Sequence, residues 1–526
     1  MRKALAAAFA LALAGMAPAA AQAAYFTGQP ADGPSADIAS LGGIALSRDG
    51  DGHVIYLKRD AGANHVFVSF LASGTPRAPL RIDTGQLTAS AEPRVGVSDH
   101  GRAVAVWVNG GSVWASLRPT DTDDWQPPQA VYAAPPAGTG ARDLQLSMGP
   151  SGAAYATFEL NGDVRVARLA ATTWTLLDAP VDIDPAAAAS DATIATSADG
   201  TALAVWSESG SVWARRIART RLSTAPQRAS IDSLDGAGGG VADSPTADVE
   251  DDSSFAWVAF RQDFGGVSRV ISRRLVGSQF QDTVAIDATS GGAEAPHIDM
   301  TGRGRGLAAL SVRGSQLTIA DTLGSDNKWD PATGLGTGAP FDPHAVSAIS
   351  ENGRGTVAWQ SGAGGGSQLF ARFWNARRFE DTSSLSDPTL GPVDGAAGID
   401  AAADAGGNQA VAYVQGDGAD RRVMVAVFDK EPRATGGGNH DDWRRTRGFA
   451  LKWSKVEDTW GGIEYHVDVD GLPLTTTTRT SASVSGLPDG RHVYSVTAVD
   501  SRGQGTEGPN RLLYVDLTAP TVQLTA

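Results

Sequence analysis

A turn followed by a short apolar strand recurs eight times along this chain, and this repeat constrains the fold more than any other feature. In each copy a turn residue, glycine in seven of them, is followed six positions later by a large apolar residue. Successive large residues lie 51, 51, 48, 54, 50, 49 and 54 positions apart. So regular a period is typical of a repeat architecture rather than of separate domains. The large residues are Tyr56, Trp107, Phe158, Trp206, Phe260, Leu310, Trp359 and Tyr413.

Each copy is predicted to form four short strands. In the second copy these strands are 94–97, 103–107, 112–117 and 129–132, without helical periodicity. The second strand is apolar at successive positions, as in Ala103-Val104-Ala105-Val106-Trp107. Because successive side chains of a strand point to opposite faces, this strand must be covered on both sides.

Four-stranded sheets at a period of about 50 residues, each covered by its neighbours, predict a β-propeller. We therefore expect an all-β fold with an eight-bladed β-propeller over residues 24–430, or a seven-bladed one if one copy is degenerate. The eighth copy has a Gly-rich linker, 431–447, where its fourth strand should fall. The expected substitute is the N-terminal stretch 24–27, which would pair with the last blade and close the ring.

The repeat resembles that of secreted bacterial propeller proteins in which an Asp-Gly or Asn-Gly turn precedes an Ala-Val-Trp strand. Asp199-Gly200 and Asn352-Gly353 are examples, and the resemblance covers about residues 36–430. The repeat is also distantly similar to the aspartate box of sialidase-like propellers. In that motif an additional residue separates the aspartate from the glycine.

Residues 448–517 resemble a fibronectin type III domain, an immunoglobulin-like β-sandwich. The landmarks are a strand 449–453 that ends in Trp453, a strand 463–467, Leu487 and Tyr494. The resemblance implies that Trp453 fills the core between the sheets and that Tyr494 makes a corner hydrogen bond. It also implies a spacer outside the cell. Residues 518–526 are expected to be a tail or the start of a further immunoglobulin-like module.

Residues 1–23 have the parts of a secretory signal peptide: Arg2 and Lys3, an apolar run over 4–14, and the small residues of Ala21-Gln22-Ala23. Cleavage would change the net charge from −15 to −17, which argues against nucleic acid or anionic lipid as a partner. After signal removal no stretch is apolar enough for a transmembrane segment. We expect a secreted or cell-surface protein that is a monomer.

The chain shows no recognisable catalytic or metal-binding set of residues. It has no cysteine, which excludes thiol catalysis and cysteine-bound metals, and its eight histidines follow no metal-ligand spacing. Asp49, Asp199 and Asn352 are expected to cap their own turns. Asp49 and Asp51 lack the later acidic residue of a calcium loop. We expect no catalytic residue, no metal and no cofactor.

Candidate binding residues follow the second strand of each copy, because binding residues concentrate on loops held by a rigid scaffold. They are Arg59, Asp60, Asn109, Glu159, Glu208, Arg261, Asp263, Arg313, Gln360, Gln415 and Asp417. Our leading hypothesis is a binding or adhesion protein that recognises an extracellular glycan or protein through this loop face. The alternatives are a glycan-cleaving, sialidase-like hydrolase and a purely structural surface protein.

Overall fold

The computed structural model describes residues 24–526 except 121, 123, 136–138, 185, 252, 254, 288–291, 313–316, 338–344, 363–365, 439–441, 520 and 522–526. The described chain is all-β, which confirms the predicted class, and it divides into two compact units. One unit is residues 25–428, and the other begins at Asp429. The predicted signal peptide, 1–23, lies outside the described residues. Over the described ranges, no helix is long and apolar enough to cross a membrane.

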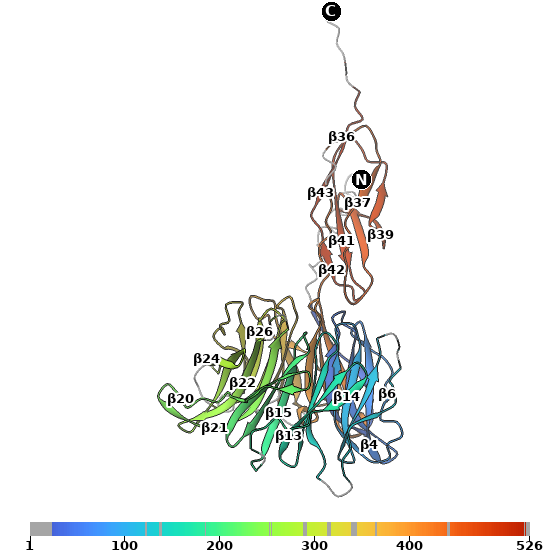
Figure 1. Ribbon diagram of the computed structural model, residues 1–526. Helices are drawn as coiled ribbons and strands as arrows, with labels where there is room; N and C mark the ends of the chain where they lie inside the picture. Colours follow the sequence, from blue (N-terminus) through green and yellow to red (C-terminus); the bar gives the residue numbers. More distant parts are fainter. Residues whose placement is uncertain are drawn as a thin grey trace, which may run out of the picture. The chain divides into compact units, whose positions relative to one another are not determined.

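The described part of residues 25–428 forms eight antiparallel sheets, drawn from blue through green and yellow to orange in Figure 1. The first strands are β2 (Ile38–Leu46), β7 (Ser90–Val97), β11 (Arg142–Met148), β15 (Ala189–Thr196), β21 (Ala237–Glu250), β25 (Ala293–Met300), β29 (Ala345–Ile349) and β33 (Ile399–Ala403). The second strands are β3 (Gly52–Asp60), β8 (Ala103–Asn109), β12 (Ala154–Leu160), β16 (Thr201–Glu208), β22 (Phe255–Phe264), β26 (Gly306–Val312), β30 (Gly355–Ser361) and β34 (Gln409–Gln415).

Outside these lie third strands and short outer strands. The third strands are β4 (Ala63–Ala72), β9 (Ser112–Arg118), β13 (Asp163–Ala170), β17 (Ser211–Ala218), β23 (Val267–Val276), β27 (Leu317–Leu323), β31 (Gln368–Trp374) and β35 (Arg422–Asp429). The outer strands are β5 (Thr75–Pro76), β6 (Leu80–Arg81), β10 (Gln129–Tyr132), β14 (Thr173–Leu176), β18 (Arg221–Leu222), β19 (Gln227–Arg228), β24 (Gln279–Ala285), β28 (Thr333–Thr337) and β32 (Ser383–Ser384). β20 (Ser233–Leu234) flanks β21, and short 3-10 turns cover Pro388–Leu390, Gly395–Ala397 and Gly418–Asp420.

The first strands form a closed ring. Each contacts the first strands of the sheets before and after it, and β2 contacts β33, so the first and last sheets are neighbours. Sheets arranged radially around a closed inner ring are the architecture of a β-propeller. The ring encloses a central channel that is lined by first-strand side chains.

The last sheet contains strands from both ends of this unit. β1 (Ala24–Asp32) lies beside β35, in the order β1-β35-β34-β33. The Tyr25 hydroxyl is 2.6 Å from Oγ1 of Thr356, and the Tyr25 ring packs edge-on against Phe428 at 5.1 Å between centroids. The N-terminal strand therefore occupies the outermost position of a sheet whose other strands come from the end of the unit.

The repeated turn and the large residue after it both serve the scaffold. Gly200 has φ +77°, and Asp199 Oδ1 accepts a hydrogen bond from the Thr201 N–H at 2.8 Å. Asn352 caps the Arg354 N–H in the same way at 2.9 Å, so the predicted turn capping is confirmed at both positions. All eight large residues are buried, with at most 4% of their surface exposed.

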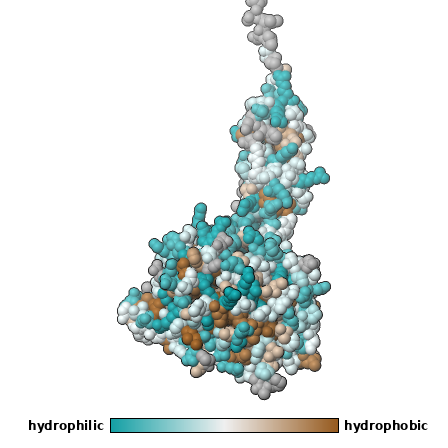
Figure 2. All heavy atoms as spheres, in the orientation of Figure 1, coloured by the Kyte–Doolittle hydropathy of each residue, from teal (hydrophilic) through white to brown (hydrophobic). Residues whose placement is uncertain are grey.

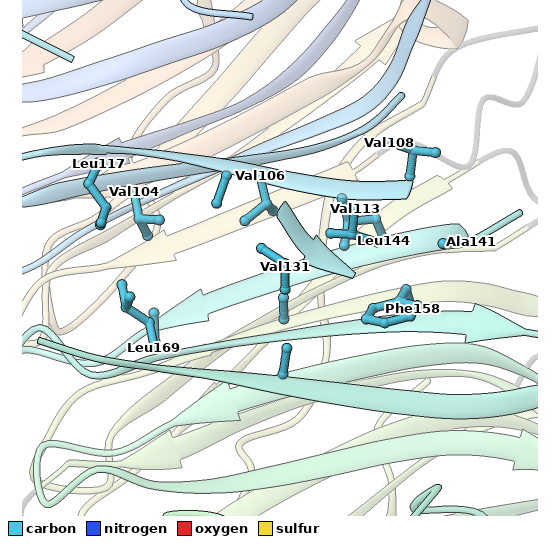
Figure 3. Close-up of a cluster of buried hydrophobic side chains, with 14 residues drawn as sticks. Val104, Val106, Val108, Val113, Leu117, Val131, Ala141, Leu144, Phe158 and Leu169 are labelled. Atoms are coloured by element: carbon cyan, nitrogen blue, oxygen red, sulfur yellow. The ribbon is translucent and has the colours of Figure 1, made fainter. Parts of the chain in front are cut away.

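Apolar side chains fill the space between neighbouring sheets. Figure 3 shows Val104 and Val106 of β8 facing Leu144, Phe158 and other residues of the next sheet. Every residue of β8 is buried, as expected for a strand covered on both faces. Each fully buried side chain of this size contributes about 1.5–3 kcal/mol. On the face that Figure 2 shows, hydrophilic residues cover most of the surface and hydrophobic residues are visible between them.

The C-terminal unit is a β-sandwich. One sheet contains β36 (Trp443–Arg444), β43 (Arg511–Val515), β41 (Gly490–Val499), β38 (Glu464–Val469) and β39 (Leu472–Thr477), with β42 (Gly505–Glu507) beside β41. The other pairs β37 (Phe449–Lys452) with β40 (Ser481–Val484). Trp453 is buried in the core against Tyr465, at 5.4 Å between ring centroids, and the Tyr494 hydroxyl donates to Gly438 O at 3.3 Å.

Part of the stretch expected to be a linker, 431–447, is held to this sandwich. Arg511 Nη2 donates to Thr435 O at 2.7 Å, while Gly436 and Ser454 exchange hydrogen bonds of 2.8 and 2.9 Å. A Cβ at Gly436 would lie 2.6 Å from Ser454 Oγ, and one at Gly437 would lie 3.0 Å from Lys452 O. These glycines permit close packing, which the sequence alone does not distinguish from linker flexibility.

Candidate functional site

Aspartates of the inner ring connect neighbouring sheets through the backbone. Asp400 Oδ2 accepts the Ile44 N–H of the next sheet at 2.9 Å, and its Oδ1 accepts the Ala401 N–H at 2.9 Å. Asp248 Oδ2 accepts the Met300 N–H at 2.7 Å in the same way. One carboxylate thus satisfies backbone donors on two adjacent first strands.

Asp248 and Asp299 lie together inside the ring. The Met300 N–H donates both to Asp248 Oδ2 at 2.7 Å and to Asp299 Oδ1 at 3.1 Å, so these two oxygens face the same hydrogen. Asp299 Oδ2 also accepts the Ile349 N–H at 2.6 Å. Burial raises the pKa of Asp299 to about 6, and burial together with the Asp299 charge raises the pKa of Asp248 well above its usual range. Two adjacent carboxylates inside a protein favour holding a proton.

A cavity of about 440 Å³ opens inside the channel where five copies of the repeat contribute the same position. Each contributing residue is the seventh before the turn glycine of its own copy. The five residues are Gly43, Arg94, Gln145, His297 and Asp400. Leu41, Leu146 and Ile399 add apolar walls. The volume lies in the range of about 300–1,000 Å³ that small-molecule sites occupy.

β2 contributes two glycines, Gly42 and Gly43, to the lining of the cavity. A Cβ at Gly43 would lie 2.9 Å from Asp400 Oδ2, and one at Gly42 would lie 2.4 Å from Pro93 O. Arg94 Nη1 approaches Gly42 O at 3.5 Å from the other side. Arg94 and Asp400 therefore pack against a stretch of β2 that has no side chains, and any added side chain there would collide with its neighbours.

Arg94 is fixed by the scaffold on one edge of its guanidinium. Nε donates to Gln145 Oε1 at 3.1 Å, and Nη1 donates to Pro93 O at 3.0 Å. Burial lowers the pKa of Arg94, and the nearby charges of Asp400 and Glu92 oppose that shift. Within the described ranges Nη2 of Arg94 and Nε2 of Gln145 have no protein partner, so both remain available as donors.

His297 adds a neutral donor. Nδ1 of His297 lies 3.3 Å from the Ser347 N–H, which donates to it, and 3.0 Å from Ser347 Oγ; with Nδ1 as acceptor, the neutral ring carries its proton on Nε2. Burial lowers the pKa of His297 to about 4, so the imidazole stays uncharged at neutral pH. On the opposite side, burial raises the pKa of Asp400 to about 6. The cavity thus combines one guanidinium, two neutral donors and one carboxyl group.

A second cavity, of about 240 Å³, lies where the turns between first and second strands surround the channel. Its lining includes Arg48, Asp99, Asp251, Glu351 and Asp404. Arg48 and Asp99 form an ion pair at 3.6 Å, and Glu351 Oε1 accepts the Gly302 N–H at 3.0 Å. No group of His, Asp and Glu residues in the described chain has the arrangement of a metal site.

Five of the predicted loop-face residues bond to the scaffold beside them. Glu208, for example, accepts the N–H groups of Ile183 and Asp184 at 3.1 and 2.8 Å, and the Trp206 indole N–H at 2.9 Å. The other four make similar contacts: Asn109 with Thr88 and Ser90, Glu159 with Arg142, Gln360 with Ser367 and Val393 O, and Gln415 with Asp387 O and Gly391 O.

The remaining predicted residues are more exposed. Asp60 forms an ion pair with Arg81 at 2.8 Å. Arg261 donates hydrogen bonds to both carboxylate oxygens of Asp243, at 2.6 and 2.8 Å. Arg59 and Asp417 are exposed and Asp263 is half-buried, whereas Arg313 lies outside the described residues. None of the described members of this set lines the 440 Å³ cavity.

The predicted binding residues follow the second strands, whereas the cavity residues lie on first strands, ahead of the turn in each copy. Counting seven residues back from each turn glycine would have found Arg94, Gln145, His297 and Asp400 at one aligned position. A polar residue in a first strand, where apolar residues are expected to pack, was the available signal.

No protein-family model matches the chain, and no curated protein matches it. Solved structures that resemble it include an ulvan lyase of a polysaccharide lyase family bound to a GlcA–Rha3S saccharide (11% identity, 69% of this chain and 96% of that one, TM-score 0.40). Others are the six-bladed fucose-recognising lectin of Aleuria aurantia (12%, 52% and 90%, 0.32) and an α-L-arabinofuranosidase of Fusarium graminearum (10%, 64% and 91%, 0.34). At these identities and TM-scores no activity or site residue carries over to this chain.

Proposed function

We propose that this chain is an exported, eight-bladed β-propeller followed by a fibronectin type III-like spacer, and that it binds an extracellular glycan in the central channel. The observation that carries the proposal is the 440 Å³ cavity lined by Arg94, Gln145, His297 and Asp400. A few convergent polar groups among apolar walls are what a small-molecule site requires.

Several features favour binding over hydrolysis. Glycoside hydrolysis commonly uses two carboxyl groups on either side of the bond that breaks. In the described chain, Asp400 is the only carboxyl group among the lining residues of this cavity. Both Asp400 oxygens already accept backbone N–H groups, and His297 has its Nδ1 occupied. Such fixed groups suit recognition better than proton transfer.

The loop face suggests a second candidate function, in which a protein partner docks there. Leu87 and Ile183 lie in connections that enter first strands, and Val241 lies within the first strand β21; they are 93%, 44% and 54% exposed. A protein partner that docks there would cover these exposed apolar side chains. Arg59, Asp263 and Asp417 would then be contact residues at this face.

Binding of saccharides to the full mature chain tests the glycan proposal. The protein is applied to a glycan array, and the best ligand is measured by calorimetry with wild type and Arg94→Met. Arg48→Met, at the turn end of the channel, is the matched control. We expect Arg94→Met to weaken binding and Arg48→Met to leave it unchanged. Absence of any glycan binding, or equal binding by all three proteins, would contradict the proposal.

Export is tested separately by sequencing the N-terminus of protein recovered outside the cell. A mature protein that begins at Ala24 is the expected result. Protein that retains Met1 and stays inside the cell would contradict export.

A further inference from the structure

The charge around the cavity argues for an uncharged ligand. Arg94 is the one formal cation among the lining residues, and Asp400 and Glu92 both act on it electrostatically. The Glu92 carboxylate accepts the Leu144 N–H at 2.7 Å, so it is held close to the ring. A guanidinium balanced in this way offers little net attraction to an anion. The net charge of −15 over the whole chain also disfavours the binding of an anion.

The hydrogen-bonding groups match hydroxyl groups, which both donate and accept. Arg94 Nη2, Gln145 Nε2 and His297 Nε2 can donate to ligand oxygens, and each is oriented by a bond that its side chain already makes to the protein. Asp400 uses one lone pair of each oxygen for backbone N–H groups, which leaves further lone pairs for ligand hydroxyls.

Arg94 and Asp400 reach the cavity from the two strands that flank β2. Gly42 and Gly43 line the cavity between them, and Leu41, Leu146 and Ile399 supply apolar contact for C–H groups. Arg94 and Gln145 lie on one side of β2 and Asp400 lies on the other, while His297 comes from β25, across the ring from Arg94. A pyranose or furanose ring with neighbouring hydroxyl groups has both the shape and the bonding pattern that this space offers.

We propose that the cavity at Gly43 holds an uncharged sugar residue, with hydroxyl groups shared between Arg94 and Asp400 and a C–H face against Leu146 and Ile399. This inference rests on the proposed glycan-binding function and specifies its ligand class. It distinguishes neutral saccharides from those that carry carboxylate or sulfate groups.

The first test uses a glycan array in which neutral oligosaccharides are printed beside their uronate and sulfated counterparts. The full mature chain should bind neutral members and should not prefer the charged ones. The best neutral ligand is then titrated by calorimetry between about 0.1 M and about 1 M NaCl, where the Debye length falls from about 10 Å to about 3 Å. The affinity for an uncharged sugar should stay constant over this range.

The second test uses Asp400→Asn, because this substitution should change the affinity for neutral sugars and the affinity for anionic sugars in opposite directions. For a neutral sugar the loss of a charged acceptor should weaken binding about tenfold. For an anionic sugar the same change removes repulsion and should strengthen binding. Gln145→Met should weaken neutral-sugar binding about threefold to tenfold and provides an independent readout if Asp400→Asn does not fold.

The outcomes distinguish failure of this inference from failure of the proposed function. Preference for acidic glycans, with salt-dependent affinity and tighter binding by Asp400→Asn, would overturn the neutral-sugar inference while the cavity remained a glycan site. Absence of glycan binding, or binding that Arg94→Met and Gln145→Met both leave unchanged, would overturn both.

Discussion

The Tyr56 hydroxyl donates a hydrogen bond to Asp32 Oδ2 at 2.6 Å and thereby connects the first sheet to the strand that completes the last one. Lys58 Nζ lies 2.9 Å from the same oxygen. Tyr56 is fully buried, and the Asp32 side chain is only 9% exposed. The two ends of the ring are therefore joined by a polar contact in addition to backbone pairing.

Asp32→Ala should lower the free energy of unfolding by about 2–3 kcal/mol, because hydrogen bonds to a charged group are worth about 1.5–3 kcal/mol and Tyr56 loses its acceptor. Tyr56→Phe should cost about 1 kcal/mol. Urea denaturation measures both, with the exposed Asp178→Ala as control. Stability equal to wild type in Asp32→Ala would show that this contact does not hold the ring closed.

Glu208→Ala should destabilise the protein by about 3 kcal/mol or more, since three donors lose one buried charged acceptor. Thermal unfolding followed by tryptophan fluorescence also reports on Trp206, which loses its partner. Asp417→Ala, a change at an exposed residue of the same predicted set, should stay within about 0.5 kcal/mol of wild type. Equal stability of the two variants would show that Glu208 does not stabilise the fold.

Stability should fall as pH rises from about 4 to about 7. Folding raises the pKa values of Asp248 and Asp299, so between the unfolded and folded pKa values the native state holds protons that the unfolded state has released. The stabilisation is complete below the unfolded pKa and is lost as pH rises through the folded values. His297 acts in the opposite direction, since its lowered pKa favours the native state as pH rises above about 4.

Asp248→Asn isolates the carboxyl contribution, because an amide cannot ionise. Its free energy of unfolding, measured in urea at several pH values between about 4 and about 7, should fall less steeply with pH than that of wild type. Asp178→Asn should keep the wild-type slope. A slope unchanged by Asp248→Asn would mean that the pair ionises in the native state without cost.

Gly43→Ala should destabilise the protein by about 1–3 kcal/mol and weaken ligand binding. Gly43 has φ +146°, and an added Cβ would lie 2.9 Å from Asp400 Oδ2. Gly85→Ala is a matched control, because Gly85 also has positive φ, +80°, but has no atom within 4 Å of the added Cβ. If Gly43→Ala lowers the free energy of unfolding more than Gly85→Ala does, as measured by thermal unfolding, the difference is due to the contact of the added Cβ with Asp400.

The repeat predicted the all-β class because its signals are local. The second strand is apolar at successive positions, as from Ala202 to Trp206 in β16, and the turn needs a residue that accepts positive φ, as Gly200 does. Both properties can be read within ten residues. The four strands expected in the second copy correspond to β7, β8, β9 and β10.

The cavity could not be predicted in the same way, because it depends on which residues face one another across the ring. Arg94 and Gln145 are 51 residues apart, and Asp400 meets Ile44 across 356 residues of sequence. The sequence shows that Arg94, Gln145 and Asp400 are polar residues in first strands, but it does not show which residues they meet. The sequence predicts that Glu208 binds a ligand, because it lies at the end of a strand. In the structure its carboxylate accepts a hydrogen bond from the backbone N–H of Asp184, in the connection that precedes β15.

The pairing of β1 with β35 also constrains the order of folding. About 400 residues separate these strands, so the first strand to be synthesised stays unpaired until the last repeat is made. Contacts of such high sequence separation form slowly, since a large loop-closure entropy opposes them. The ring can therefore close only after β35 has been synthesised, and until then the edge of the last sheet lacks β1.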